Sequence, residues 1–121
     1  MSKTVLVVDD SGSFRMVVKV GLQRAGYQVL EARNGRHATE LLDGRDIHLV
    51  VCDLNMPEMD GLAFARYLRS TSYSATPLVM LTTESQSSKE KDTDGLNISN
   101  WITKPFLPST LQETVSRLCP L

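Results

Sequence analysis

Residues 4–10 read Thr-Val-Leu-Val-Val-Asp-Asp, an unbroken run of mostly β-branched residues that ends in two aspartates. Such a run is typical of a strand that is buried on both faces of a parallel sheet. The apolar residues that follow, from Phe14 to Ala25, recur every three or four positions, and Gly26 stands where helices often end. The start of the chain therefore predicts a strand followed by a helix.

The same alternation continues along the chain and predicts a (βα)5 arrangement. Four more apolar runs predict strands at 27–32, 49–52, 78–81 and 101–103, and helical spacing predicts helices at 38–42, 61–68 and 108–118. Residues 82–95 contain no strongly apolar side chain, and a helix of about two turns from Ser87 to Gly95 fits this crossover best. We predict an α/β fold with one doubly wound, five-stranded parallel sheet and helices on both faces.

Length and composition limit the classes of function. The 121 residues predict one domain, 1–121, and a formal net charge of −1 offers no general attraction to nucleic acid or to an anionic membrane. No apolar run approaches the roughly 18 residues of a membrane span, and there is no signal-peptide pattern. Cys52 and Cys119 form no C-x-x-C motif. We therefore expect a cytoplasmic protein with reduced cysteines.

Polar side chains stand at the carboxyl ends of four predicted strands. Asp9 and Asp10 follow the first, Asp53 follows the third, Thr82 follows the apolar run of the fourth, and Lys104 follows the fifth. These ends are neighbours in a parallel sheet, where ligands gather. Carboxylates about 5 Å apart would repel by roughly 3 kcal/mol per pair at an effective dielectric constant near 20. A divalent cation offsets such repulsion, so the sequence predicts a site for Mg²⁺ and a phosphoryl group.

Four stretches in this order resemble the receiver domain of two-component response regulators. They are Val-Leu-Val-Val-Asp-Asp-Ser at 5–11, Asp-Leu-Asn-Met-Pro-Glu-Met-Asp-Gly at 53–61, Leu-Thr-Thr-Glu at 81–84 and Lys-Pro-Phe at 104–106. The resemblance covers essentially the whole chain and implies the flavodoxin-like receiver fold. Within the family, residues 81–85 and 100–106 look most like the chemotaxis (CheY-like) members.

The resemblance implies a role for each matching residue of the acidic site. Asp53 would be the phosphoacceptor and would share in binding Mg²⁺. Asp10 would bind the ion directly, Asp9 would bind it through water, and the backbone carbonyl of Asn55 would complete the protein ligands.

The remaining implied roles concern the phosphoryl group and its readout. Thr82 and Lys104 would donate hydrogen bonds to phosphoryl oxygens, and the Lys104–Pro105 bond would be cis. Trp101 stands where the family often has a smaller aromatic residue that moves inward on activation. Glu84 flanks the phosphorylation site, as in fast-cycling chemotaxis regulators.

The sequence is compatible with three functions. The leading hypothesis is a stand-alone response regulator, which is not an enzyme beyond its own phosphorylation and dephosphorylation. A histidine kinase, chemotaxis-type by resemblance, would phosphorylate Asp53 in a Mg²⁺-dependent step, and the new surface would bind a flagellar motor switch protein or another output protein. A phosphorelay intermediate that passes phosphate to a histidine phosphotransfer protein would share every site residue. A phosphatase of the haloacid dehalogenase type would need a second acid where Asn55 stands.

Overall fold

The five strands form one parallel sheet in the order β2-β1-β3-β4-β5. The computed structural model describes residues 3–83 and 95–121. Every neighbouring pair is parallel, as predicted, and the strand order reverses between β1 and β3. This reversal is the topological switch point, outside whose carboxyl ends ligands bind in folds of this kind. The strands are β1 (Thr4–Val8), β2 (Gln28–Ala32), β3 (Leu49–Asp53), β4 (Leu78–Thr82) and β5 (Asn100–Thr103).

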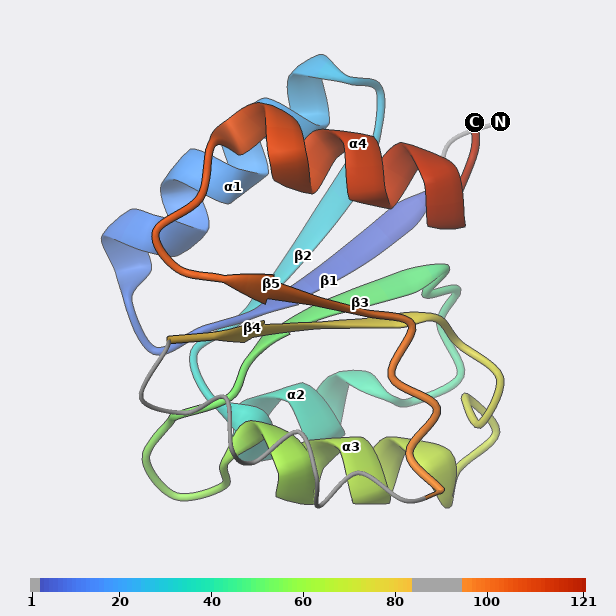
Figure 1. Cartoon of the computed structure of the whole chain (residues 1–121). Helices are drawn as coiled ribbons and strands as arrows, with labels where there is room; N and C mark the ends of the chain where they lie inside the picture. The colour runs from blue at the N-terminus through green and yellow to red at the C-terminus, as the bar shows by residue number, and fades with distance from the viewer. Residues whose placement is uncertain (1–2, 84–94) are drawn as a thin grey trace.

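Helices cover both faces of the sheet (Figure 1). Helices α1 (Gly12–Arg24) and α4 (Pro108–Leu118) lie on one face, and α2 (Gly35–Leu41) and α3 (Gly61–Arg69) lie on the other. The helix predicted from Ser87 to Gly95 falls almost entirely at 84–94, outside the described residues. No helix of the described chain is long and apolar enough to cross a membrane.

Strand side chains divide into two apolar cores because successive residues point to opposite faces. On β1, Leu6 and Val8 face the core shared with α3, whereas Val5 and Val7 face the core shared with α1 and α4. Strands β3 and β4 are buried along their whole length. The buried central strands therefore hold the side chains at their carboxyl ends in fixed positions.

Helix α2 begins three residues before the predicted start at 38. Asn34-Gly35 is a dipeptide typical of turns, but the Asn34 side chain accepts a hydrogen bond from the His37 N–H at 2.7 Å. Asparagine is a preferred residue for capping a helix in this way. The same dipeptide that marks a turn thus starts the helix.

Gly61 allows α3 to begin directly against the end of β3. Its N–H donates to the Leu54 carbonyl at 2.8 Å. A Cβ at this position would lie 2.5 Å from the Asp53 carbonyl oxygen and 2.8 Å from the Leu54 Cα. Asp60 caps the helix by accepting the Ala63 N–H at 2.8 Å. Residues 55–60 therefore form a loop whose two ends touch.

Candidate functional site

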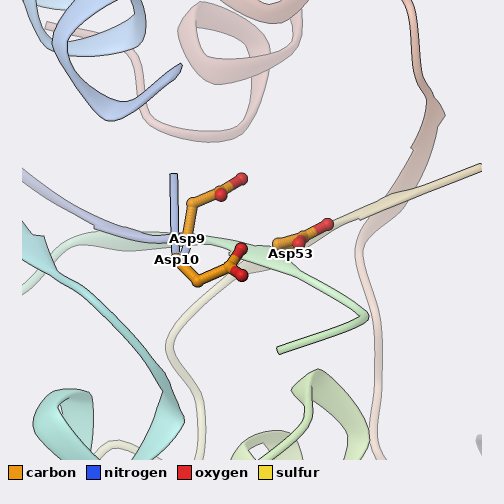
Figure 2. Close-up of side chains that lie close together, drawn as sticks. All are labelled: Asp9, Asp10 and Asp53. Atoms are coloured by element: carbon orange, nitrogen blue, oxygen red, sulfur yellow. The ribbon is translucent and has the colours of Figure 1, made fainter. Parts of the chain in front are cut away.

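Three carboxylates meet at the carboxyl ends of β1 and β3. Asp9 and Asp10 follow β1, Asp53 ends β3, and one oxygen of each lies within 4.8 Å of the others. Figure 2 shows the three side chains gathered above these strand ends. Asp9 and Asp53 are buried, whereas Asp10 is exposed. The structure thus brings together the predicted acidic residues and leaves one of them open to solvent.

Asp9 accepts three hydrogen bonds, and its own N–H donates to the Ala32 carbonyl at 3.1 Å. Its Oδ1 accepts the Ser11 N–H at 2.9 Å, and its Oδ2 accepts from the Lys104 Nζ at 3.0 Å. Its backbone carbonyl accepts from Arg15 Nη1 at 2.6 Å. Ser11 also caps α1 through a hydrogen bond from the Phe14 N–H. The turn that carries Asp9 and Asp10 is therefore held by the first residues of the helix that follows it.

Lys104 reaches the acidic cluster from the carboxyl end of β5, which is an edge strand of the sheet. Its Nζ lies 3.3 Å from Asp53 Oδ1 as well as 3.0 Å from Asp9 Oδ2. The Lys104 N–H also donates to the Thr82 carbonyl, and the Lys104–Pro105 bond is cis, as the resemblance implied. Burial opposes the charged form, but the hydrogen bond that Lys104 donates to Asp9 and the negative charges of Asp9 and Asp53 leave the pKa of Lys104 above its usual value.

The surroundings of Asp53 change the pKa of its carboxyl group. Burial, followed by the negative charge of Asp9, raises the pKa of Asp53 to about 6. The charge of Lys104 acts in the opposite direction and does not cancel this shift. Within the described part of the chain, Lys104 is the residue that forms ion pairs with this cluster of three carboxylates, so negative charge there exceeds positive charge.

The remaining predicted residues that the structure describes lie on β4, on β5 and in the loop after β3. Thr82 is fully buried at the end of β4, where its Oγ1 donates to the Thr83 carbonyl at 3.1 Å. Asn55 is exposed in the loop after β3. Trp101 is half-buried on β5 beside Met80, its partner in register, and packs against the core on the α3 side. Glu84 lies outside the described residues.

Three residues near the site were not predicted for it from the sequence. Ser11 and Arg15 hold the Asp9 turn, and Phe14 places its ring 4.2 Å from the Lys104 Nζ. Their position in the first helical turn after the aspartate pair was the available signal. Phe14 was assigned to the apolar core stripe of α1, and it does pack there as well.

The sequence of residues 5–116 matches the family of the response regulator receiver domain. This chain belongs to that family. The receiver domain is 41% identical over 112 residues to a protein named chemotaxis protein CheY1 from Helicobacter pylori, with 90% of each chain covered. In structure it is similar to the chemotaxis protein CheY4 of Vibrio cholerae, with a TM-score of 0.90, 39% identity, and 98% and 99% of the two chains covered.

Receiver domains of this family also occur within larger signalling proteins. The signal receiver domain of a signal transduction histidine kinase from Syntrophus aciditrophicus is 32% identical to this chain, with a TM-score of 0.88 and 97% and 89% of the two chains covered. The fold and the family are therefore common to chemotaxis proteins and to receivers attached to kinases.

The donor set of this receiver domain fits a hard divalent cation. Its atoms are carboxylate oxygens, which Mg²⁺ prefers, and the exposed side chain of Asp10 leaves the ion an entry path. Lys104 supplies one positive charge against three negative ones, so a dication would leave the cluster close to neutral after allowing for that lysine. The residues present thus fit the magnesium ion that the family implies.

Proposed function

We propose that this receiver domain is a chemotaxis-type response regulator that is switched by phosphorylation of Asp53. One observation carries the proposal: the buried carboxylate of Asp53 lies within 3.3 Å of the Lys104 ammonium and within reach of two further carboxylates. A nucleophile, a cation and a metal-binding donor set are the parts that phosphoryl transfer to a carboxylate requires.

Asp53 acts as the nucleophile toward a phosphohistidine of a partner kinase. A carboxylate oxygen forms a bond to phosphorus while the phosphorus–nitrogen bond breaks, and the imidazole leaves with the electron pair of that bond and takes up a proton from solvent. The product is an acyl phosphate on Asp53. Lys104 donates a hydrogen bond to one phosphoryl oxygen, and the Thr82 hydroxyl turns from the Thr83 carbonyl to another.

Asp10, Asp53 and the backbone carbonyl of Asn55 would hold Mg²⁺, and Asp9 would take part through water. When bound, the ion neutralises negative charge on the carboxylates and on the phosphoryl oxygens. Both carboxylate oxygens of Asp9 already accept hydrogen bonds, one from the Ser11 N–H and the other from Lys104, which supports an indirect role for Asp9.

Phosphorylation is read out through β4 and β5. Met80 pairs with Trp101 and Thr82 pairs with Thr103. Because side chains alternate along a strand, Met80, Thr82 and Trp101 share one face of the sheet. Movement of Thr82 toward the phosphoryl group vacates volume near Trp101, which changes the surface offered to a partner. The match to relatives named chemotaxis proteins supports a partner that acts in chemotaxis, and the partner we propose is a flagellar motor switch protein.

A phosphorelay intermediate is the second candidate, because a similar receiver domain belongs to a histidine kinase. Such a protein would pass the phosphoryl group from Asp53 to a histidine phosphotransfer protein. The same Asp53 chemistry serves both functions, so they differ only in the next acceptor.

Transfer from an autophosphorylated chemotaxis kinase tests the proposal. We expect radiolabel to move to the wild type in the presence of Mg²⁺, and neither to Asp53→Asn nor to the wild type in chelator. The phosphorylated protein, and not the unphosphorylated one, should then bind a motor switch protein. Loss of label to a histidine phosphotransfer protein, without such binding, would favour the relay instead. Equal labelling of Asp53→Asn would show that the phosphoacceptor is wrongly assigned.

A further inference from the structure

The aromatic ring of Phe14 lies against the ammonium of Lys104. The distance from Nζ to the ring centroid is 4.2 Å, well inside the roughly 6 Å over which a cation is attracted to the face of an aromatic ring. The same nitrogen lies 3.0 Å from Asp9 Oδ2 and 3.3 Å from Asp53 Oδ1. A ring and two carboxylate oxygens therefore surround one ammonium group.

The Phe14 ring is itself held in place. Its N–H is bonded to the Ser11 side chain at 3.2 Å, which fixes the first turn of α1. Its ring meets that of Phe106 edge-on, with centroids 5.9 Å apart and an interplanar angle of 87°, an arrangement that aromatic pairs prefer. Phe106 comes two residues after Lys104, on the connection that passes α1 in Figure 1. Phe14 thus contacts both ends of the segment 104–106.

A hollow of about 430 Å³ lies beside this contact. It is lined by Phe14, Thr83, Lys104, Pro105 and Phe106. A lysine side chain is flexible along four carbons, so the hollow offers Lys104 space to turn away from the carboxylates. The face of the Phe14 ring favours the position in which the ammonium stays at Asp9 and Asp53.

We propose that Phe14 is a positioning residue that keeps the Lys104 ammonium at the phosphoacceptor. The role rests on the proposed function, since Lys104 matters for phosphotransfer only if Asp53 accepts the phosphoryl group. The aromatic face acts on the charge, whereas the bulk of the ring serves packing. A residue of similar volume without a π-system therefore keeps the fold and loses the positioning.

Two substitutions at Phe14 separate these contributions. Phe14→Leu keeps an apolar side chain and removes the π-face, and Phe14→Tyr keeps the ring. Val17→Ala is the matched control, because Val17 lies one turn further along α1, is 60% exposed, and lines a separate pocket that Lys104 does not reach. Phe14→Met serves as a second apolar variant if the leucine protein does not fold.

The first measurement is the rate at which acetyl phosphate phosphorylates Asp53. We expect Phe14→Leu to slow it by about two- to fivefold, the range for a cation–π contact at a partly exposed site. Phe14→Tyr and Val17→Ala should match the wild type. In a Lys104→Met background, Phe14→Leu should cause no further loss, because the ring acts through the lysine. An equal loss in both backgrounds would overturn the positioning role.

The second measurement needs neither phosphate nor metal. Protons above an aromatic ring are shielded, so the Lys104 side-chain methylene nearest Nζ should give an upfield-shifted NMR signal in the wild type and in Phe14→Tyr. The shift should disappear in Phe14→Leu. Its absence from the wild type would overturn the contact. If the wild type shows the shift but takes up no phosphate, the proposed function is refuted, and with it the role of Lys104 in phosphotransfer. If Phe14→Leu is phosphorylated at the wild-type rate, only the positioning role of Phe14 is refuted.

Discussion

Lys104 donates a hydrogen bond to Asp9 across 95 positions of sequence, with Nζ 3.0 Å from Oδ2. Asp9 is almost completely buried, and a buried charge that loses its partner is costly. Lys104→Met should therefore lower the free energy of unfolding in chelator by about 1–3 kcal/mol. Lys19→Met, which removes a more exposed ion pair with Glu31, should change it by less than about 1 kcal/mol. Equal changes in the two variants, measured by urea unfolding, would show that Lys104 does not stabilise the cluster.

The ionisation of Asp53 should make metal-free stability depend on pH. Its pKa is raised in the folded protein from 3.8 to about 6, so between these values the folded state binds more protons than the unfolded state. Stability contributed by this group is therefore lost as the pH rises from about 4 to 6, by up to about 3 kcal/mol. The difference in unfolding free energy between wild type and Asp53→Asn should grow over this range and level off above it. A constant difference from pH 4 to 7.5 would contradict the prediction.

Magnesium should stabilise the wild type, because it offsets the electrostatic repulsion among the three carboxylates. At a hundredfold excess over Kd, an ion that binds only the folded state adds about 2.7 kcal/mol. Asp10→Asn removes one negative charge, so it should raise stability in chelator by up to about 1 kcal/mol and weaken the gain from Mg²⁺. Asp43→Asn is the control, since Asp43 pairs with Arg45 away from the cluster. Melting temperatures of Asp10→Asn below those of wild type in chelator would argue against repulsion.

Trp101 should report phosphorylation through its fluorescence. It is the only tryptophan, and it shares a sheet face with Thr82 across the β4–β5 pairing. Mg²⁺ with beryllofluoride, a phosphoryl mimic, should shift its emission in the wild type and leave it unchanged in Asp53→Asn and Thr82→Ala. If the mimic is shown to bind at Asp53 and the emission does not move, Trp101 is a static residue of the edge strand.

Gly61 should tolerate no side chain. Its Cβ would lie 2.5 Å from a backbone oxygen of Asp53, which cannot move without shifting the end of β3, so Gly61→Ala should destabilise the fold by about 2 kcal/mol or more. At Gly12 the nearest atom to an added Cβ is 3.6 Å away, at the end of the Arg15 side chain. Gly12→Ala should therefore be neutral or stabilising by up to about 1 kcal/mol. Similar thermal unfolding of the two variants would contradict this contrast.

The sequence predicted the sheet because β1, β3 and β4 are buried on both faces and read as continuous apolar runs. The same logic located Asp9, Asp53 and Thr82, since each stands at the end of such a run. The early start of α2 was missed because asparagine followed by glycine favours both a turn and a helix cap, and only the backbone conformation decides between them.

The contacts among side chains from distant segments could not be predicted in the same way. The ring of Phe14 reaches Lys104 because the 104–106 segment passes the first turn of α1, and no periodicity in the sequence encodes that approach. Arg15 binds the Asp9 carbonyl for a similar reason, although it lies only six positions away. Patterns of hydrophobicity specify faces and strand ends, whereas the partners of a polar group depend on the finished tertiary structure.

The hydrogen bond from the Gly61 N–H to the Leu54 carbonyl separates sequence changes inside the loop 55–60 from changes at the strand and helix that the loop joins. It closes the loop 55–60 at its base, so an exposed residue inside the loop, such as Asn55, can change without altering the span between β3 and α3. Asn55 is exposed within that loop, two residues after Asp53, which ends β3 outside the loop. On the proposed function, selection on exposed loop residues would change the lifetime of the phosphorylated state while the residues that form the acyl phosphate stay the same. On that function, the lifetime of the phosphorylated state and the chemistry that forms it can evolve independently.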